Sequence, residues 1–281
     1  MKQIEQKNPS PYLRIDPPGE WSPVSLGELW QHRDLLTYLV LRDVRALTSS
    51  TQLGFLWIVI HPLSVAVVLI VVLGMFVKIP TGGTPYALIV LSGLMSWNYV
   101  SNAITRSSSS MLANAYLITK VYFPRLIIPI VPVISGLIEL GVMVLITASA
   151  AVYFGVPLQF SWLFLLAAGF VAMALATGVG LWFSALTVRY RDFSHAIPVI
   201  MQIGFYASPV LYPITLVPEK WRQIYDLNPL VGIVELTRWS LFGEAPFPTF
   251  SISTSIAWAV MLIATGVFYF RATEDVAADL V

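Results

Sequence analysis

Charged residues are missing from long stretches of this chain, and this separation limits its fold more than any other feature. A bilayer core of about 30 Å needs roughly 20 apolar residues per helical crossing, and a charge at its centre costs roughly 2.5 to 3.5 kcal/mol on insertion scales. Glu139 is the only charge inside five stretches, which lie between Arg45 and Lys78, Lys78 and Arg106, Arg125 and Arg189, Asp192 and Glu219, and Glu244 and Arg271. The pattern predicts an all-α integral membrane protein.

Composition supports a membrane protein and excludes other classes. The chain is 57% hydrophobic and 11% charged, whereas an ordinary soluble domain has about 25% charged residues. A net charge of +1 without a basic aromatic patch gives no indication of nucleic-acid binding. Because the chain has no cysteine, disulfides and thiolate chemistry are excluded. Residues 1–30 are polar and proline-rich, so we expect no signal peptide and expect the first crossing to direct insertion.

Six crossings fit the apolar stretches and form a predicted transmembrane domain over residues 55–270. Their expected ranges are 55–77, 86–105, 126–153, 162–188, 193–213 and 250–270. This arrangement puts twelve of the 16 Lys and Arg residues on one side and leaves Lys78, Lys220, Arg222 and Arg238 on the other. Since cytoplasmic loops carry the excess of positive charge, we expect both termini, including a tail over 271–281, to be cytoplasmic.

Residues 1–54 are predicted to form a cytoplasmic tail followed by an amphipathic helix. Ser25 and Glu28 have the spacing of a capping box, in which each side chain binds a free backbone N–H of the first helical turn. Apolar residues then recur at helical spacing up to Val40, with polar residues on the other faces. We expect this helix to lie along the cytoplasmic interface; packing on a soluble partner is the alternative.

The region from 214 to 249 is the one long external segment, and its sequence predicts short helices. Asn228 and Pro229 form an N-cap and a first helical position, and the helix they start should end at Gly243. Glu235 and Arg238 lie one turn apart on it and can form an ion pair. A mostly apolar helix of this length is too short to span, so we expect a re-entrant pair of helices; a cap lying flat on the membrane is the alternative.

Residue types that would support catalysis or metal binding do not occur in recognisable patterns. Phosphate-binding loops and metalloprotease or hydrolase motifs are absent, and the three histidines are scattered. We therefore predict no catalytic site and no metal site. Glu139 lies about 21 Å along its helix from Arg125, which makes it a candidate functional acid within the membrane. The alternative is a protonated Glu139 that donates to a backbone carbonyl or to Ser135.

Aromatic residues are abundant and some lie too deep for an interfacial belt. Tyr99, Phe205, Tyr206 and Tyr212 are the candidates for lining a water-filled route. Aromatic faces stack on the C–H faces of sugar rings while the sugar hydroxyls stay hydrated, so such a route suits a saccharide. The alternative for each residue is a lipid-facing or core position.

Several short motifs, in order along nearly the whole chain, give it a family resemblance. They are Leu35-Leu36, Arg42-Asp43, Leu53-Gly54-Phe55-Leu56-Trp57, His61-Pro62-Leu63, Tyr122-Phe123-Pro124-Arg125, Arg189-Tyr190-Arg191-Asp192, Ser208-Pro209-Val210-Leu211-Tyr212-Pro213, Val217-Pro218 and Asn228-Pro229. With them the chain resembles the membrane subunits of ABC exporters of lipid-linked polysaccharides, of the O-antigen and teichoic-acid class. It departs after Arg45, where residues 47–50 replace a basic, tyrosine-containing run.

The resemblance implies a homodimer of six-helix subunits around an export channel, bound to two copies of a separate ATPase that carries ATP and Mg²⁺. The chain itself would hold no cofactor, and it would lie in the bacterial inner membrane. The resemblance assigns residues 113–123 to a coupling helix that docks on the ATPase. It also places a group of residues where the chain enters the first span. The coupling residues are Tyr116, Leu117, Tyr122 and Phe123, and the group at the first span is Arg42, Arg45, Gly54 and Trp57.

Two competing functions remain at this point. An ABC exporter of drugs or another small amphiphile would have a narrower and less aromatic route. An intramembrane enzyme such as a glycolipid transferase would need clustered carboxylates or basic groups at one interface, and the sequence shows none. Export of a lipid-linked polysaccharide is therefore the preferred prediction.

Overall fold

The computed structural model describes residues 26–49, 54–157, 159–243 and 246–280, and all regular secondary structure in these ranges is helical. The α-helices are α1 (Leu26–Gln31), α2 (Arg33–Ser49), α3 (Leu56–Leu69), α4 (Tyr86–Ala113), α5 (Ala115–Lys120), α6 (Ile127–Ser135), α7 (Leu137–Tyr153), α8 (Phe164–Arg189), α9 (Phe193–Tyr206), α10 (Glu219–Tyr225), α11 (Pro229–Phe242) and α12 (Thr249–Leu280). A π-helical segment, Ile70–Phe76, extends α3, and short 3₁₀ turns cover Phe160–Leu163 and Ile214–Leu216. The predicted all-α class is confirmed.

Within the described ranges, five helical segments are long and apolar enough to cross a membrane. They are Leu56–Phe76, Tyr86–Ala113, Ile127–Tyr153, Phe160–Arg189 and Thr249–Thr273. Each matches a predicted crossing, although the second continues to Ala113, eight residues beyond the expected end at 105, and the third is divided at Gly136 into α6 and α7.

The predicted fifth crossing over 193–213 does not appear as one long helix. Its helix, α9, has 14 residues, or about 21 Å, and ends at Tyr206. Pro209 and Pro213 follow directly, and neither can donate the backbone hydrogen bond that would continue a helix. Among the described residues, five of the six predicted crossings are therefore full-length helices, and α9 is a shorter element.

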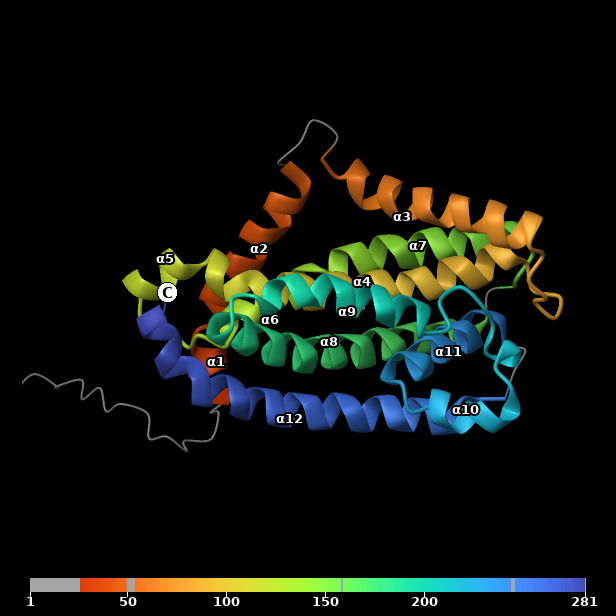
Figure 1. Cartoon of the computed structure of the whole chain (residues 1–281). Coiled ribbons are helices and arrows are strands. Elements are labelled where there is room, and N and C mark those ends of the chain that lie inside the picture. Colours follow the sequence, from red (N-terminus) through yellow and green to blue (C-terminus); the bar gives the residue numbers. More distant parts are fainter. Residues whose placement is uncertain (1–25, 50–53, 158, 244–245, 281) are drawn as a thin grey trace, which may run out of the picture.

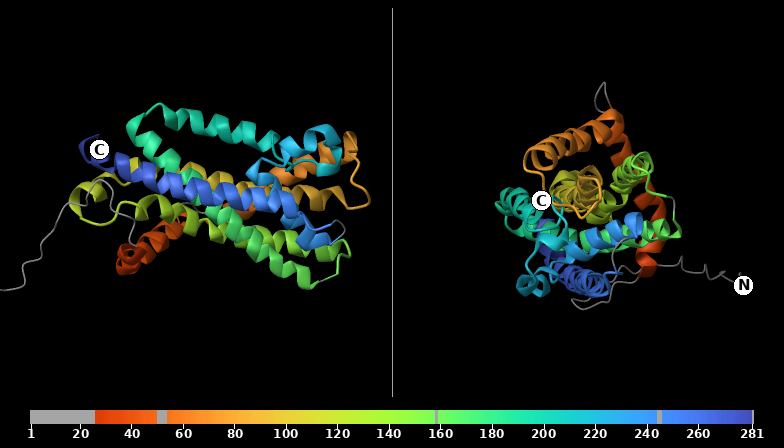
Figure 2. Two further views of the ribbon diagram at one scale, coloured as in Figure 1. Left: turned by 90° about the horizontal axis from the view of Figure 1, so that it is seen from below. Right: turned by 90° about the vertical axis from the view of Figure 1, so that its right-hand side faces the viewer.

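α4 forms the centre of the bundle. In the 18-residue apolar stretch of α4, 78% of the residues are buried. In the corresponding stretch of Leu56–Phe76, 11% are buried. The view along the helices in Figure 2 (right) shows α4 in yellow surrounded by the other helices. Buried serines on α4, among them Ser92 and Ser110, bond to carbonyls one turn back, so their hydroxyls are satisfied inside the helix. A helix with this many small polar residues can therefore be buried on all sides.

The two ends of the helix bundle carry different short helices. Figure 1 shows α1, α5 and the C-terminal end of α12 at one end, and α10 and α11 at the other. α2 crosses the first end at a steep angle to the long helices and packs on α6. α1 begins at Leu26, where the sequence predicted a helix start, although Ser25 of the expected capping box lies outside the described residues. Both ends of the described chain thus lie at the same end of the bundle as α5.

Close helix crossings depend on glycines that face neighbouring backbone. A Cβ on Gly232 of α11 would lie 2.1 Å from the carbonyl oxygen of Ser251 on α12, and a Cβ on Gly93 of α4 would lie 2.3 Å from the carbonyl oxygen of Val210. Real Cβ atoms do not approach backbone this closely, so larger residues would push these elements apart. The glycines therefore fix α11 against α12 and the segment after α9 against α4.

Gly232→Ala should destabilise the folded protein by about 1 to 3 kcal/mol, because the new methyl group overlaps backbone that has no room to move. The measurement is the midpoint of thermal unfolding in detergent. Gly141→Ala on α7 is the matched control, since a Cβ there meets nothing within 4 Å and should raise the midpoint or leave it unchanged. Equal midpoints for the Gly232 variant and the unmodified chain would contradict the packing described.

Candidate coupling site

The segment predicted to contact an ATPase forms a compact knob around α5. Tyr116 and Tyr122 are 78% and 82% exposed, and the ammonium of Lys120 lies 5.8 Å from the ring centre of Tyr116. Large aromatic rings at this exposure leave apolar surface uncovered on the described chain. The knob therefore presents two aromatic side chains away from the bundle.

Two of the four expected coupling residues do not share this exposure. Phe123 is 5% exposed and packs in a core cluster with Leu39 of α2 and Met111 of α4, and Leu117 is half-buried against the same cluster. An ATPase contact needs an exposed side chain, so the burial of Phe123 contradicts its expected place among the contact residues. Its physical role is to anchor the end of the knob to the bundle, because its ring is buried beside α2 and α4.

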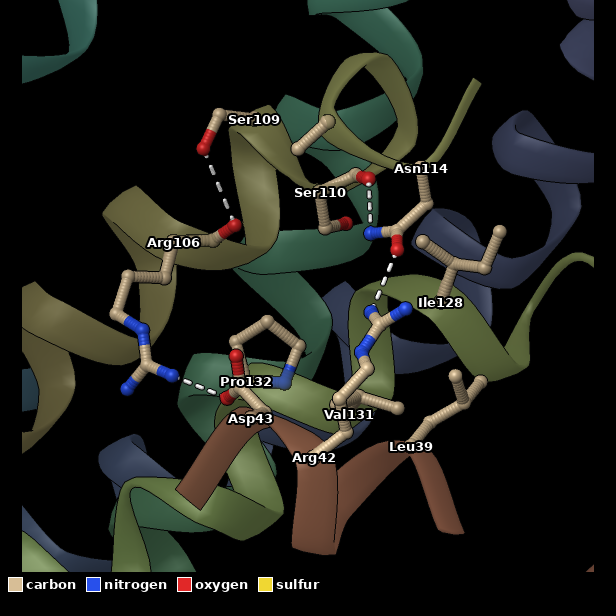
Figure 3. Close-up of a pocket in the computed structure, with 11 residues that line it drawn as sticks. Leu39, Arg42, Asp43, Arg106, Ser109, Ser110, Asn114, Ile128, Val131 and Pro132 are labelled. Atoms are coloured by element: carbon tan, nitrogen blue, oxygen red, sulfur yellow. Dashed lines mark hydrogen bonds and ion pairs between the residues drawn. The ribbon is translucent and has the colours of Figure 1, made fainter. Parts of the chain in front are cut away.

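α2 is joined to α4 at two points by consecutive residues. The Arg42 guanidinium donates to Oδ1 of Asn114 at 2.6 Å, and Asp43 pairs with Arg106. Figure 3 shows both side chains reaching from α2 toward α4 across a cavity of about 200 Å³. Asn114 is the residue between α4 and α5, and its Nδ2 donates to the carbonyl of Ser110 at 2.8 Å. Arg42 therefore connects α2 directly to the start of the knob.

Glu139, the candidate acid within the membrane, has a charged partner. Its carboxylate lies 3.5 Å from the Arg106 guanidinium and accepts from Asn102 Nδ2 at 3.0 Å. The same guanidinium pairs with Asp43 and donates to Ser135 at 3.2 Å, and Ser135 also donates to Asp43. We call these five residues the Arg106 network.

The Arg106 network places two carboxylates and one guanidinium where α2, α4, α6 and α7 meet. The side chains of Arg106 and Asp43 are 25% exposed and that of Glu139 is 17% exposed. Charged side chains that are largely withdrawn from water need partners of opposite charge. The Arg106 guanidinium balances one of the two negative charges and shares its N–H donors between both carboxylates. The sequence prediction put Arg106 just outside the second crossing and Glu139 inside the third, and nothing in the pattern indicated that the two side chains meet.

The other residues expected around the first span lie apart from the network. Gly54 has a φ of 40°, a left-handed conformation that glycine adopts without steric cost, and it immediately precedes the turn into α3. Trp57 is 49% exposed on α3, and Arg45 is exposed on α2. Arg42 of this predicted group is hydrogen-bonded to a distant segment, at Asn114 between α4 and α5.

At the opposite end, Glu235 and Arg238 form the predicted ion pair at 3.2 Å. Arg238 is 8% exposed, and its guanidinium also donates to the carbonyls of Pro209 at 2.6 Å, Tyr212 at 3.1 Å and Ile89 at 3.2 Å. Burial raises the pKa of Glu235, and the adjacent guanidinium opposes that shift. Arg238 therefore binds backbone carbonyls in the segment where α9 has ended.

The aromatic candidates separate into two groups. Tyr99 is 1% exposed and donates to the carbonyl of Val133 at 3.1 Å, so its assignment to a route is corrected to the core. Tyr206 is 61% exposed, and Phe205 packs with its ring centre 5.6 Å from that of Trp97. The Tyr212 hydroxyl lies 2.9 Å from that of Tyr225. Phe205, Tyr206 and Tyr212 therefore lie at or just after the C-terminal end of α9.

The long apolar helices define a multi-pass membrane protein. Residues 34–242 match a family model described as ABC-2 type transporter, and the chain belongs to that family. It is the membrane subunit of a transporter, which implies an ATPase partner. Within the described residues no group of three or more His, Cys, Asp or Glu side chains could hold a metal ion.

Curated relatives cover most of the chain. It is 32% identical over 253 residues to the O-antigen export system permease protein RfbA of Klebsiella pneumoniae, covering 88% of this chain and 93% of that protein. A protein of the same name from Myxococcus xanthus is 26% identical over 259 residues, with 88% and 96% coverage. The polysialic acid transport protein KpsM of Escherichia coli is 23% identical over 245 residues, with 84% and 92% coverage.

Arg238→Leu should lower the free energy of unfolding by about 3 to 5 kcal/mol, because it leaves the Glu235 carboxylate and several buried carbonyls without their donor. The effect is measured as a loss of thermal stability in detergent. Lys220→Leu, which removes an exposed cation from α10, is the matched control and should change stability little. If the two variants unfold at the same temperature, Arg238 does not stabilise this end of the bundle.

Proposed function

We propose that the chain is the permease subunit of an ABC exporter that moves a lipid-linked polysaccharide across the bacterial inner membrane. The supporting observation is the similarity to two O-antigen export permeases and a polysialic acid transport protein, each over more than four fifths of the chain. Polysaccharide is preferred over a drug or other small amphiphile because these relatives' names specify glycans. ATP and Mg²⁺ would bind to the separate ATPase.

The proposed topology has six crossings with both termini in the cytoplasm. α9 and residues 207–213 together form the fifth crossing, and Arg238 satisfies the carbonyls that the helix leaves open. The placement of α1, α5 and the end of α12 at one end supports this topology, as does the excess of Lys and Arg expected on that side. α11 packs against α4, α8 and α12, which favours a re-entrant helix over a flat cap.

The proposed assembly is a homodimer with two copies of the ATPase. Tyr116 and Tyr122 supply the ATPase contact, while Leu117 and Phe123 attach the knob to the bundle. Arg42 and Asp43 transmit movement of the knob to α2 and into the Arg106 network. Phe205, Tyr206 and Tyr212 line the outer part of the route. The path by which the chain enters the first span is determined by Arg45, Gly54 and Trp57.

Replacing both Tyr116 and Tyr122 with alanine should weaken binding of the ATPase and abolish ATP-driven export. Aromatic anchors carry about 2 kcal/mol or more each at interfaces, a factor of roughly 30 in affinity. The measurement is ATPase co-purification, followed by export of lipid-linked polysaccharide in vesicles that contain the reconstituted complex. Because both rings are exposed, thermal stability of the isolated subunit should be unchanged.

Tyr153→Ala is the control for this experiment. Tyr153 is 84% exposed at the C-terminal end of α7, away from the knob, and should be dispensable for ATPase binding. If the double variant assembles and exports like the unmodified complex, α5 is not the ATPase contact. If the unmodified complex moves no lipid-linked polysaccharide, the proposed function itself is wrong.

A further inference from the structure

The two helices between α9 and α12 are held to the bundle very differently. Nine of the 14 residues of α11 are buried, and this helix packs against α4, α8 and α12. None of the seven residues of α10 is buried, and its apolar side chains Trp221 and Ile224 are 54% and 61% exposed. Figure 1 shows α11 among the long helices and α10 at the end of the bundle. Displacing α10 would therefore cost far less buried apolar surface than displacing α11.

Polar contacts attach α11 directly to α4. The hydroxyl oxygens of Ser96 on α4 and Thr237 on α11 lie 3.1 Å apart, and both residues are buried. Arg238 of α11 donates to the carbonyl of Ile89 on α4 at 3.2 Å. Separating the two helices would leave these buried donors and acceptors unpaired, which costs more than each hydrogen bond contributes while it is formed. α11 is therefore fixed against α4.

The non-helical residues 207–212 belong to the same fixed part. Asn228, the N-cap of α11, donates to the carbonyl of the first of them at 3.1 Å, and Arg238 donates to those of the third and the sixth. Tyr86, the first residue of α4, donates to the carbonyl of the fifth at 2.8 Å. Non-helical backbone inside a membrane bundle is stable where protein groups satisfy it in this way. Movement of α11 away from α4 would remove most of these donors together.

Residues 214–225, which include α10, have one such attachment. Among the described residues, a single side-chain hydrogen bond joins this segment to the rest of the chain, between the hydroxyls of Tyr225 and Tyr212, which lie 2.9 Å apart. The other side-chain bond of the segment, made by Arg222, ends on a carbonyl within it. One hydroxyl pair therefore holds α10 in the position observed.

Both ends of this segment allow it to move as a unit. Residues 213, 217 and 218 are extended, with ψ angles of 148°, 123° and 141°, so no helix has to break before α10. After α10, the chain is attached again at Asp226, which accepts from Ser251 and Thr254 of α12 at 3.1 and 2.8 Å. The segment can thus turn between Pro213 and Asp226 without disturbing α11 or α12.

We infer that the region between α9 and α12 consists of a fixed frame and a movable lid. The frame, formed by α11 and residues 207–212, stays attached to α4 when this end of the transporter opens. The lid, formed by residues 214–225, moves, and the hydroxyl pair of Tyr212 and Tyr225 is its latch. This inference rests on the proposed function, because it gives the two parts of the re-entrant region separate roles in transport.

A reversible cross-link tests the frame in the complex with its ATPase in lipid nanodiscs. The chain has no native cysteine, and Ser96→Cys with Thr237→Cys places two thiols where the hydroxyl oxygens lie 3.1 Å apart. Iodine should form the disulfide at the same rate, within about twofold, in the resting complex and after trapping with ATP and orthovanadate. In vesicles, the oxidised complex should export at the rate of the reduced complex.

A spin label tests the lid. The label is attached to Gln223→Cys, at an exposed position of α10. Tyr225→Phe removes one hydroxyl of the latch and should raise the ratio of mobile to immobile label about fivefold in the resting complex, the effect of one lost hydrogen bond. Trapping with ATP and orthovanadate should raise this ratio as well. Tyr153→Phe makes the same change at the exposed end of α7 and is the matched control, which should leave the ratio unchanged.

Each part of the inference can fail separately. Slower cross-linking after trapping, absence of the disulfide in both states, or a loss of export that reduction restores would refute the fixed frame. Equal label mobility with and without Tyr225→Phe would refute the latch. Slower cross-linking of Ser96→Cys with Thr237→Cys in the Tyr225→Phe background would show that α10 and α11 move together, which would refute the separate lid.

The rate of cross-linking and the mobility of the label need no transported substrate, so they distinguish this inference from the proposed function. The expected rates and mobilities in a complex that exports no lipid-linked polysaccharide would support the frame and the lid and refute the proposed function. Export by a complex whose cross-linking slows on trapping would refute the fixed frame alone.

Discussion

A single guanidinium, that of Arg106, holds four helices together. It pairs with Asp43 of α2 and Glu139 of α7, donates to Ser135 of α6 and is itself part of α4. In water such contacts contribute little, but in a membrane bundle the alternative is an unpaired charge in an apolar medium. The position of α2, and through Arg42 that of the α5 knob, depends on this network.

The same constraint explains the end of the bundle that carries α10 and α11. α9 stops well short of a full crossing, so the carbonyls after Tyr206 need donors, and Arg238 of α11 supplies them. The close approach of this segment to Gly93 leaves no room for water between it and α4. In both places one arginine, half-buried Arg106 or buried Arg238, supplies hydrogen-bond donors to acceptors that water reaches poorly. The ends differ in that Arg106 binds side chains alone, whereas Arg238 binds backbone carbonyls in addition to the Glu235 carboxylate.

Much of the fold follows from one-dimensional patterns. Apolar stretches located five spanning helices, and Asn228 with Gly243 bounded α11, whose side-chain cap and left-handed terminus the structure contains. The predictions that failed concern features that depend on tertiary geometry. Tyr99 and Phe123 are aromatic residues whose burial is set by neighbours far along the chain. The contact between Arg106 and Glu139 joins residues 33 positions apart, and its formation depends on where α4 and α7 cross.

The most direct test of the central role of Arg106 compares its single neutralisation with removal of all three charges. Arg106→Gln leaves two carboxylates unpaired and should cost about 3 to 5 kcal/mol of stability, while adding Asp43→Asn and Glu139→Gln should restore stability without restoring ATP-driven export. Asp34→Asn, at an acid whose side chain is 98% exposed on α2, is the control. Unchanged stability of Arg106→Gln, or normal export by the triple variant, would contradict the account.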